Sequence, residues 1–146
     1  WGELVESCVN LSLESIDKLK RFIFEIVPKY NTQNLRVILA GFSQGGMISC
    51  YAGITIPNLV DGIVILSSPF IKELNNVDFG KVNLDIPIFL SHGINDLVVS
   101  ITDARQMKEK LLKRGYKIDY KEYPLEHSIN QSVVDDVLNW LKIKFN

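Results

Sequence analysis

The feature that most constrains the fold is a series of short, continuously apolar runs, each about as long as a β-strand. They cover residues 35–42, 61–68 and 86–93, with Gly or Pro at their ends. A run of this kind is typical of a strand that is buried on both faces of a parallel sheet. Residues 116–124 instead alternate apolar and polar side chains, which predicts a strand nearer the edge of the sheet.

Segments with the helical spacing of apolar residues separate these runs. The predicted helices cover residues 13–27, 44 to about 56, 101–112 and 131–141. Residues 100–103 and 128–131 both begin with serine and resemble capping boxes, so Ser100 and Ser128 are the expected N-caps. The side chains expected to face inward from the third helix are Ile101, Ala104, Met107, Leu111 and Leu112. The repeated strand-helix units predict an α/β fold over a single domain, residues 1–146, with a mostly parallel sheet and helices on both faces.

The composition narrows the class of protein. The chain of 146 residues has a formal net charge of −1, which gives no electrostatic indication of a nucleic-acid partner or an anionic membrane. No apolar run approaches the roughly 18 residues of a membrane span, and no leader pattern is present, so we expect a cytoplasmic protein without stable membrane insertion. Cys8 and Cys50 lack metal-site or redox spacing and are expected to be free, buried thiols.

Ser43 is the candidate nucleophile of the sequence. It lies in the string Gly-Phe-Ser-Gln-Gly (residues 41–45), between an apolar run and a predicted helix. Glycines two residues to either side would let the strand turn sharply into the helix, where the neighbouring backbone comes very close. The helix N-terminus favours developing negative charge, so the backbone N–H of Gln44 is the expected oxyanion donor. The alternative is a chance match around a tight turn that contains a serine.

A serine hydroxyl needs a base to become a good nucleophile, and the chain contains two histidines. His127 follows the last predicted strand, and Asp96 follows the predicted strand at residues 86–93. Both residues are therefore expected at the same carboxyl edge of the sheet as Ser43. Serine, acid and histidine is also the chain order of the triad in α/β-hydrolases. In that arrangement Asp96 orients the ring of His127 and stabilises its charged form, without taking its proton.

Other residues compete for these roles. His92 comes before the acid in the chain, and we interpret it as a structural residue that holds the following turn. Glu126 is a competing acid because it is adjacent to His127, although neighbouring side chains seldom meet in an extended loop. Taken alone, Asp96 could be an ordinary turn residue, because asparagine and aspartate are both common in turns.

The strings Gly-Phe-Ser-Gln-Gly-Gly (41–46) and Ser-His-Gly-Ile-Asn-Asp-Leu-Val-Val (91–99), with the later His-Ser pair at 127–128, resemble the phospholipase/carboxylesterase family of α/β-hydrolases. This family includes acyl-protein thioesterases and small bacterial carboxylesterases. The resemblance covers the whole chain, but only the later part of a family member.

The resemblance implies a set of roles. Ser43 would be the nucleophile, Asp96 the acid and His127 the base, with Gln44 as one oxyanion donor. Two further residues beside the acid, Leu97 and Val98, would line the entrance and bind substrate. The implied substrate is an ester or a thioester, with no cofactor and no metal.

The resemblance also implies an α/β-hydrolase fold that lacks its first strands and the loop that donates the second oxyanion N–H. The run at residues 35–42 would then be an apolar edge strand, which invites pairing with another chain. We therefore expect this chain to associate with the missing N-terminal segment or with a second copy of itself. The family usually has a small residue before the histidine, where this chain has Glu126.

The sequence leaves three hypotheses open. The first is a serine hydrolase that cleaves carboxylic esters or thioesters through an acyl-enzyme intermediate. The second is a truncated, non-catalytic remnant that acts as a binding or assembly module. The third keeps the triad but changes the substrate to peptides, as in oligopeptidase-type hydrolases. The short spacing and the Phe-Ser-Gln-Gly-Gly string favour the esterase over the peptidase.

Overall fold

The computed structural model describes residues 2–30, 35–56, 59–70 and 83–146, and it describes side chains from residue 14 onward. The chain divides into two compact units, residues 1–35 and 36–146. In the first unit, helix α1 (Gly2–Ile26) leads into the short 3-10 helix η1 (Val27–Tyr30). The helix predicted from residue 13 is therefore confirmed, and it begins earlier in the chain. Cys8 lies outside the described side chains.

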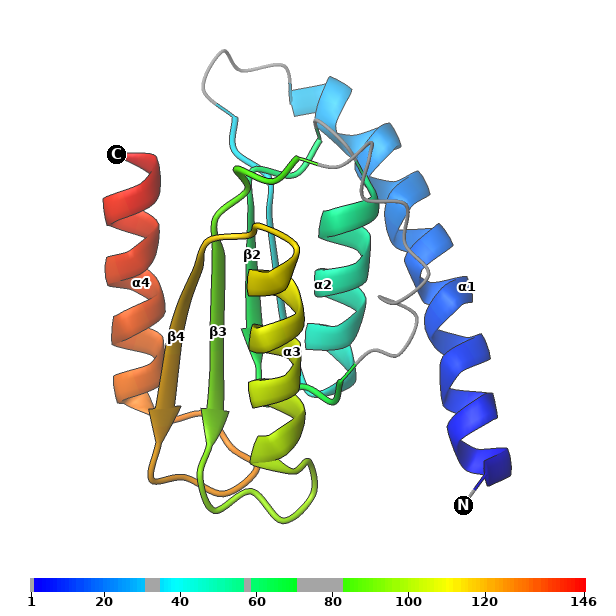
Figure 1. Ribbon diagram of the computed structural model, residues 1–146. Helices are drawn as coiled ribbons and strands as arrows, with labels where there is room; N and C mark the ends of the chain where they lie inside the picture. Colours follow the sequence, from blue (N-terminus) through cyan, green and yellow to red (C-terminus); the bar gives the residue numbers. More distant parts are fainter. Residues whose placement is uncertain (1, 31–34, 57–58, 71–82) are drawn as a thin grey trace. The chain divides into compact units, whose positions relative to one another are not determined.

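The second unit is a parallel sheet with helices on both faces. Its strands are β1 (Ile38–Phe42), β2 (Gly62–Leu66), β3 (Ile88–Gly93) and β4 (Ile118–Tyr123), and its helices are α2 (Gln44–Thr55), α3 (Ile101–Lys113) and α4 (Gln131–Phe145). All neighbouring strands pair in parallel, in the spatial order β1-β2-β3-β4. Figure 1 shows α2 and α3 on one side of this sheet and α4 on the other.

The core follows from the alternation of side chains along the central strands. Val64 of β2 and Phe89 of β3 pack with Trp140 of α4 on one face. Ile63 and Ile65, the alternate residues of β2, point to the other face, and neither is exposed at all. Because both faces of β2 and β3 are covered, these strands read as continuous apolar runs, as predicted.

The edge strands differ from the central ones. β4 alternates between half-buried and exposed residues, which confirms the predicted strand near the edge. β1 pairs only with β2 among the described residues, and its Ala40 is exposed. In the described sheet β1 is therefore not buried on both faces, although its apolar sequence predicts that. Its position is that of the apolar edge strand implied by the family resemblance.

The N-cap of α3 agrees with the sequence pattern, whereas the N-cap of α4 differs from it. Ser100 caps α3, because its side chain accepts a hydrogen bond from the Thr102 N–H. The cap of α4 is Asn130 and not Ser128, since the Asn130 Oδ1 accepts from the Val133 N–H at 3.1 Å. The N–H of Ser128 instead donates to the Glu126 carbonyl, so Ser128 belongs to the preceding turn.

The inward face of α3 is narrower than predicted. Ala104, Met107 and Leu111 are fully buried, at successive positions of one helical stripe. The spacing predicts that Leu112 also faces inward, but its side chain is 47% exposed because it lies about 100° around the helix from Leu111. Cys50 of α2 is free and buried, as predicted, and burial raises the pKa of its thiol to about 12. None of the described helices combines the length and apolar character that a membrane span requires.

Candidate active site

The ends of three strands bring the predicted triad residues together. Ser43 directly follows β1, Asp96 lies in the turn after β3, and His127 lies in the loop after β4. Because the strands are parallel, all three residues lie at the carboxyl edge of the sheet, where α/β proteins bind their ligands.

These residues form a continuous hydrogen-bonded relay. The Nδ1 atom of His127 lies 2.7 Å from Asp96 Oδ2, and its Nε2 atom lies 3.1 Å from Ser43 Oγ. A carboxylate can only accept, so Nδ1 carries the hydrogen and donates it to Asp96. In the neutral ring Nε2 then holds a lone pair and accepts the hydrogen bond of the Ser43 hydroxyl. This is the geometry of a serine activated by a general base.

The backbone at Ser43 is strained. Its φ of 55° and ψ of −123° lie outside the regions that non-glycine residues usually occupy, and such a conformation costs about 1–3 kcal/mol. The surrounding structure holds it: the Ser43 N–H donates to the Leu66 carbonyl at 2.8 Å, which extends the pairing of β1 with β2. Strain of this kind is typical of the sharp strand-to-helix turn that exposes a nucleophile.

The two glycines that flank Ser43 have different roles. A Cβ at Gly41 would lie 2.1 Å from the carbonyl carbon of Gly45, so β1 and α2 could not approach each other as they do. A Cβ at Gly45 would meet no described atom within 4 Å. Crowding therefore explains Gly41 but not Gly45, where the sequence-based prediction of the same cause is wrong.

Asp96 is held by hydrogen bonds in a buried position. Its Oδ1 accepts from the Val98 N–H at 2.9 Å and from the Val99 N–H at 2.8 Å, and its side chain is not exposed. Burial opposes ionisation and tends to raise the pKa of Asp96, but the hydrogen bonds from Val99, His127 and Val98 together outweigh it. The pKa of Asp96 therefore lies below its usual range, and the carboxylate is charged at neutral pH.

The loop that carries His127 passes very close to the end of β3. A Cβ at Gly93 would lie 2.3 Å from the Leu125 carbonyl oxygen, so only glycine allows this approach. The ring of Phe42 packs against the ring of His127, with centroids 4.6 Å apart. The sequence pattern gave no sign of this contact, because Phe42 occupies a variable position of the glycine-serine-glycine pattern. Glu126, the competing acid, is exposed, and the carboxylate that His127 contacts is that of Asp96.

The remaining predicted site residues lie around this relay. Gln44 is the first residue of α2, and its backbone N–H lies in the first turn, where a helix offers no internal acceptor. Leu97 is 95% exposed and Val98 is 73% exposed, so both aliphatic side chains lie at the surface beside Asp96. Among the described residues, no group of three or more histidine, cysteine or acidic side chains could hold a metal ion.

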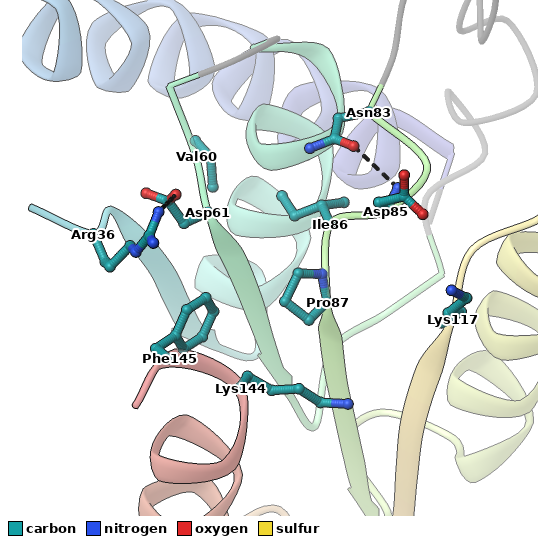
Figure 2. Close-up of a pocket in the computed structure, with 10 residues that line it drawn as sticks. All are labelled: Arg36, Val60, Asp61, Asn83, Asp85, Ile86, Pro87, Lys117, Lys144 and Phe145. Carbon is teal, nitrogen blue, oxygen red and sulfur yellow. Dashed lines mark hydrogen bonds and ion pairs between the residues drawn. The ribbon is translucent and has the colours of Figure 1, made fainter. Parts of the chain in front are cut away.

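A pocket of about 460 Å³ lies at the amino ends of the strands, the end of the sheet opposite to the triad. Figure 2 shows that its lining comes from residues just before the strands, such as Arg36, Asp61, Pro87 and Lys117, together with Phe145 of α4. The Arg36 guanidinium donates to the Asp61 carboxylate at 3.1 Å across part of it. Because amino and carboxyl ends of parallel strands lie at opposite edges, this pocket is separate from the triad.

Comparison with known proteins identifies the family. The model of the phospholipase/carboxylesterase family matches residues 6–145, so the chain belongs to this family. It is 31% identical over 132 residues to acyl-protein thioesterase 1 of Debaryomyces hansenii, which covers 88% of this chain and 56% of the relative. It is also 33% identical over 149 residues to acyl-protein thioesterase 1 of Gibberella zeae, covering 97% and 63%.

Solved structures confirm the predicted α/β-hydrolase fold. The crystal structure of Arabidopsis thaliana SOBER1 superposes with a TM-score of 0.81 at 24% identity, over 92% of this chain and 65% of that one. The Bacillus cereus carboxylesterase superposes with a TM-score of 0.74 at 17% identity, over 92% and 62%. The chain thus spans roughly 60% of the length of the relatives it matches.

Proposed function

We propose that this chain is a serine hydrolase that cleaves carboxylic esters or thioesters through an acyl-enzyme intermediate. The observation that carries the proposal is the relay from Ser43 Oγ through His127 to Asp96, with distances of 3.1 and 2.7 Å. Membership of the phospholipase/carboxylesterase family supports the same class of reaction.

In the first half of the reaction, Ser43 Oγ bonds to the carbonyl carbon of the substrate while its proton passes to His127 Nε2. The carbonyl electrons form an oxyanion, which the N–H of Gln44 stabilises at the N-terminus of α2. When this intermediate collapses, the C=O bond re-forms and the bond to the alcohol or thiol breaks. The leaving group takes the proton from His127, and the acyl group remains on Ser43.

In the second half, a water molecule attacks the acyl carbon and gives a proton to His127. Collapse then breaks the bond to Ser43 Oγ, which takes the proton back and releases a carboxylic acid. Asp96 stays ionised throughout and holds the charged His127 ring in place. Each oxyanion donor is worth about 10²–10³ in rate, so a second donor besides Gln44 would contribute strongly.

The substrate class that fits best is an acylated alcohol or thiol. Acyl-protein thioesterase is the name of the relatives, and we extend their substrate class to this chain as part of the proposal. Leu97 and Val98 present aliphatic side chains beside the acid, and we assign them to the entrance, where they would contact an acyl chain.

Hydrolysis of p-nitrophenyl esters of increasing chain length, together with a matched acyl thioester and a peptide, tests this proposal. Activity on the esters or the thioester should disappear in Ser43→Ala and persist in Ser132→Ala, a control at an exposed serine of α4. Cleavage confined to the peptide would support the oligopeptidase alternative. A folded wild type that cleaves nothing would support the non-catalytic remnant.

We also propose that the free edge of β1 pairs with another strand, from a preceding N-terminal segment or from a second copy of the chain. The observation behind this is that β1 pairs only with β2 among the described residues and exposes part of its apolar sequence. Unpaired edges of this kind favour association. Light scattering after size-exclusion chromatography should show a species larger than the 16.6 kDa monomer. A monodisperse monomer at high concentration would contradict pairing with a second copy of the chain.

A further inference from the structure

The second histidine of the chain lies against the same acid. His92 is on β3, and its side chain is completely buried. Its Nε2 atom lies 2.9 Å from the Val99 carbonyl oxygen and 3.4 Å from Asp96 Oδ2. The contact with Val99 confirms the interpretation that His92 holds the following turn, and the approach to Asp96 goes beyond it.

The acceptors fix the tautomer of His92. A backbone carbonyl can only accept a hydrogen bond, so Nε2 must carry the hydrogen. The other ring nitrogen, Nδ1, is buried and has no hydrogen-bond partner among the described residues. The ring therefore offers one donor, and that donor points at the turn that carries the acid.

The turn after β3 is held at its two ends by different groups. At its start, the N–H groups of Ile94 and Asn95 donate to the carbonyls of Tyr123 and Leu125, at 2.7 and 3.0 Å. At its end, the Val99 carbonyl accepts from His92. His92 thus connects the last residue of the turn to the rigid strand that precedes it, and this closes the turn around Asp96.

The two oxygens of Asp96 depend on this closure in different ways. Oδ1 accepts from the N–H groups of Val98 and Val99, which belong to the same turn and would move with it. Oδ2 faces the two histidines, His127 at 2.7 Å and His92 at 3.4 Å. The backbone of Asp96 is tied to β3 by its N–H, which donates to the Gly93 carbonyl at 3.3 Å. His92 is the side chain of the sheet that lies against Oδ2 itself, and so helps to fix the position of this oxygen relative to Ser43.

We propose that His92 is a positioning residue. Its Nε2–H holds the turn of Asp96 closed and thereby fixes the position of the Asp96 carboxylate relative to the ring of His127. This inference rests on the proposed function, because the alignment matters only if His127 acts on Ser43. A displacement of about 1 Å in a catalytic group can cost about 10²-fold in rate. Loss of the His92 donor should therefore slow the reaction of Ser43 without removing any triad member.

The test compares His92→Gln with His92→Leu. The glutamine amide can place an N–H close to the position of Nε2, whereas leucine fills similar space without a donor. Phe89→Leu is the matched control, because Phe89 is also buried on β3 but packs with Trp140 of α4, on the opposite face of the sheet. The thermal midpoint of each variant is measured alongside, so that a general loss of packing is recognised.

The first readout is the rate at which a fluorophosphonate labels the protein, since this step needs the triad but no acyl pocket. We expect His92→Leu to label about tenfold or more slowly than wild type. His92→Gln should recover most of that rate, and Phe89→Leu should label at the wild-type rate despite a lower thermal midpoint. Equal rates for His92→Leu and Phe89→Leu, or no recovery in His92→Gln, would overturn the proposal.

The second readout is the imidazole nitrogen NMR spectrum, which needs no reaction. The chain has only two histidines, so His92→Gln and His127→Gln assign both rings directly. We expect His92 to be the Nε2–H tautomer, and the Nδ1–H signal of His127 to shift or broaden in His92→Leu but not in His92→Gln. An Nδ1–H tautomer for His92, or an unchanged His127 signal, would overturn the inference. Absent labelling of wild type with these NMR results intact would count against the proposed function only.

Discussion

At the scale of single residues, the site depends on backbone that only glycine allows. Gly41 lets α2 begin directly behind Ser43, and Gly93 lets the loop of His127 cross the end of β3. The strained conformation of Ser43 persists because these close approaches and the hydrogen bond to Leu66 fix it. The proposed reaction therefore depends on close contacts between backbone atoms, which hold Ser43 and His127 in place.

Replacing each glycine beside Ser43 by alanine tests this view. Gly41→Ala should lower the free energy of unfolding by about 1–3 kcal/mol or more, because its Cβ would lie 2.1 Å from the Gly45 carbonyl carbon. Gly45→Ala should be neutral, or stabilising by up to about 1 kcal/mol, because its Cβ meets nothing and alanine favours the helix. Denaturant unfolding measures both. Equal destabilisation by the two changes would contradict the structure.

The choice of acid is a second prediction at this scale. Asp96→Asn should reduce the rate of fluorophosphonate labelling by about 10³–10⁴-fold, because the ring of His127 then loses the carboxylate that fixes its tautomer. Glu126→Gln is the control, since Glu126 is exposed and adjacent in sequence. A larger loss in Glu126→Gln than in Asp96→Asn would assign the role of the acid to Glu126.

At the scale of elements, a surface network connects α3 with the edge strand β4. The Arg105 guanidinium donates two hydrogen bonds to Glu122, each 2.8 Å long, and the Tyr120 hydroxyl donates a third at 2.7 Å. The hydrogen bonds from Arg105 and Tyr120 lower the pKa of Glu122 to about 2. Among the described residues, Arg105–Glu122 is the ion pair that joins α3 to β4, and Glu122 is paired in the sheet with His92 of β3.

The lowered pKa of Glu122 determines how the stability of the protein changes with pH. In wild type the contribution of Glu122 to stability is complete above the unfolded pKa of about 4.3 and is lost as pH falls toward about 2. Glu122→Gln should therefore be less stable than wild type near neutral pH, with the difference vanishing toward pH 2. Because the Arg105 side chain is 55% exposed, the difference should be about 1 kcal/mol or less. Unfolding curves between pH 2 and 7 measure it, and a difference that grows toward low pH would contradict the assignment.

At the scale of the whole molecule, the sequence predicts the fold and the edge at which the site lies. Apolar runs identify the strands because both faces of β2 and β3 are covered, and parallel pairing then places the ends of β1, β3 and β4 at one edge. The approach of His92 to Asp96 and of Phe42 to His127 could not be predicted. These contacts depend on side-chain directions across different strands, which no spacing within one segment encodes. That residues 1–146 form a single domain stays a prediction.

The N-cap of α4 also could not be predicted from the sequence. Ser128 and Asn130 are both good caps, and the sequence does not state where the turn after His127 ends. The backbone bond from Ser128 to Glu126 decides the matter, because it commits Ser128 to the turn. The fold of the loop that carries His127 thus places the N-cap two residues later than the sequence pattern predicts, at Asn130, while the helix begins at Gln131.

The assignment of Ser43 as the nucleophile is tested most sharply by the mass of the covalent adduct formed with a fluorophosphonate, mapped by peptide sequencing. We predict one adduct per chain, on Ser43, formed rapidly in wild type and absent from Ser43→Ala. His127→Gln should form it far more slowly, because the proton of Ser43 then has no base. An adduct on another serine, or a folded wild type that forms none, would contradict the assignment of Ser43 as the nucleophile.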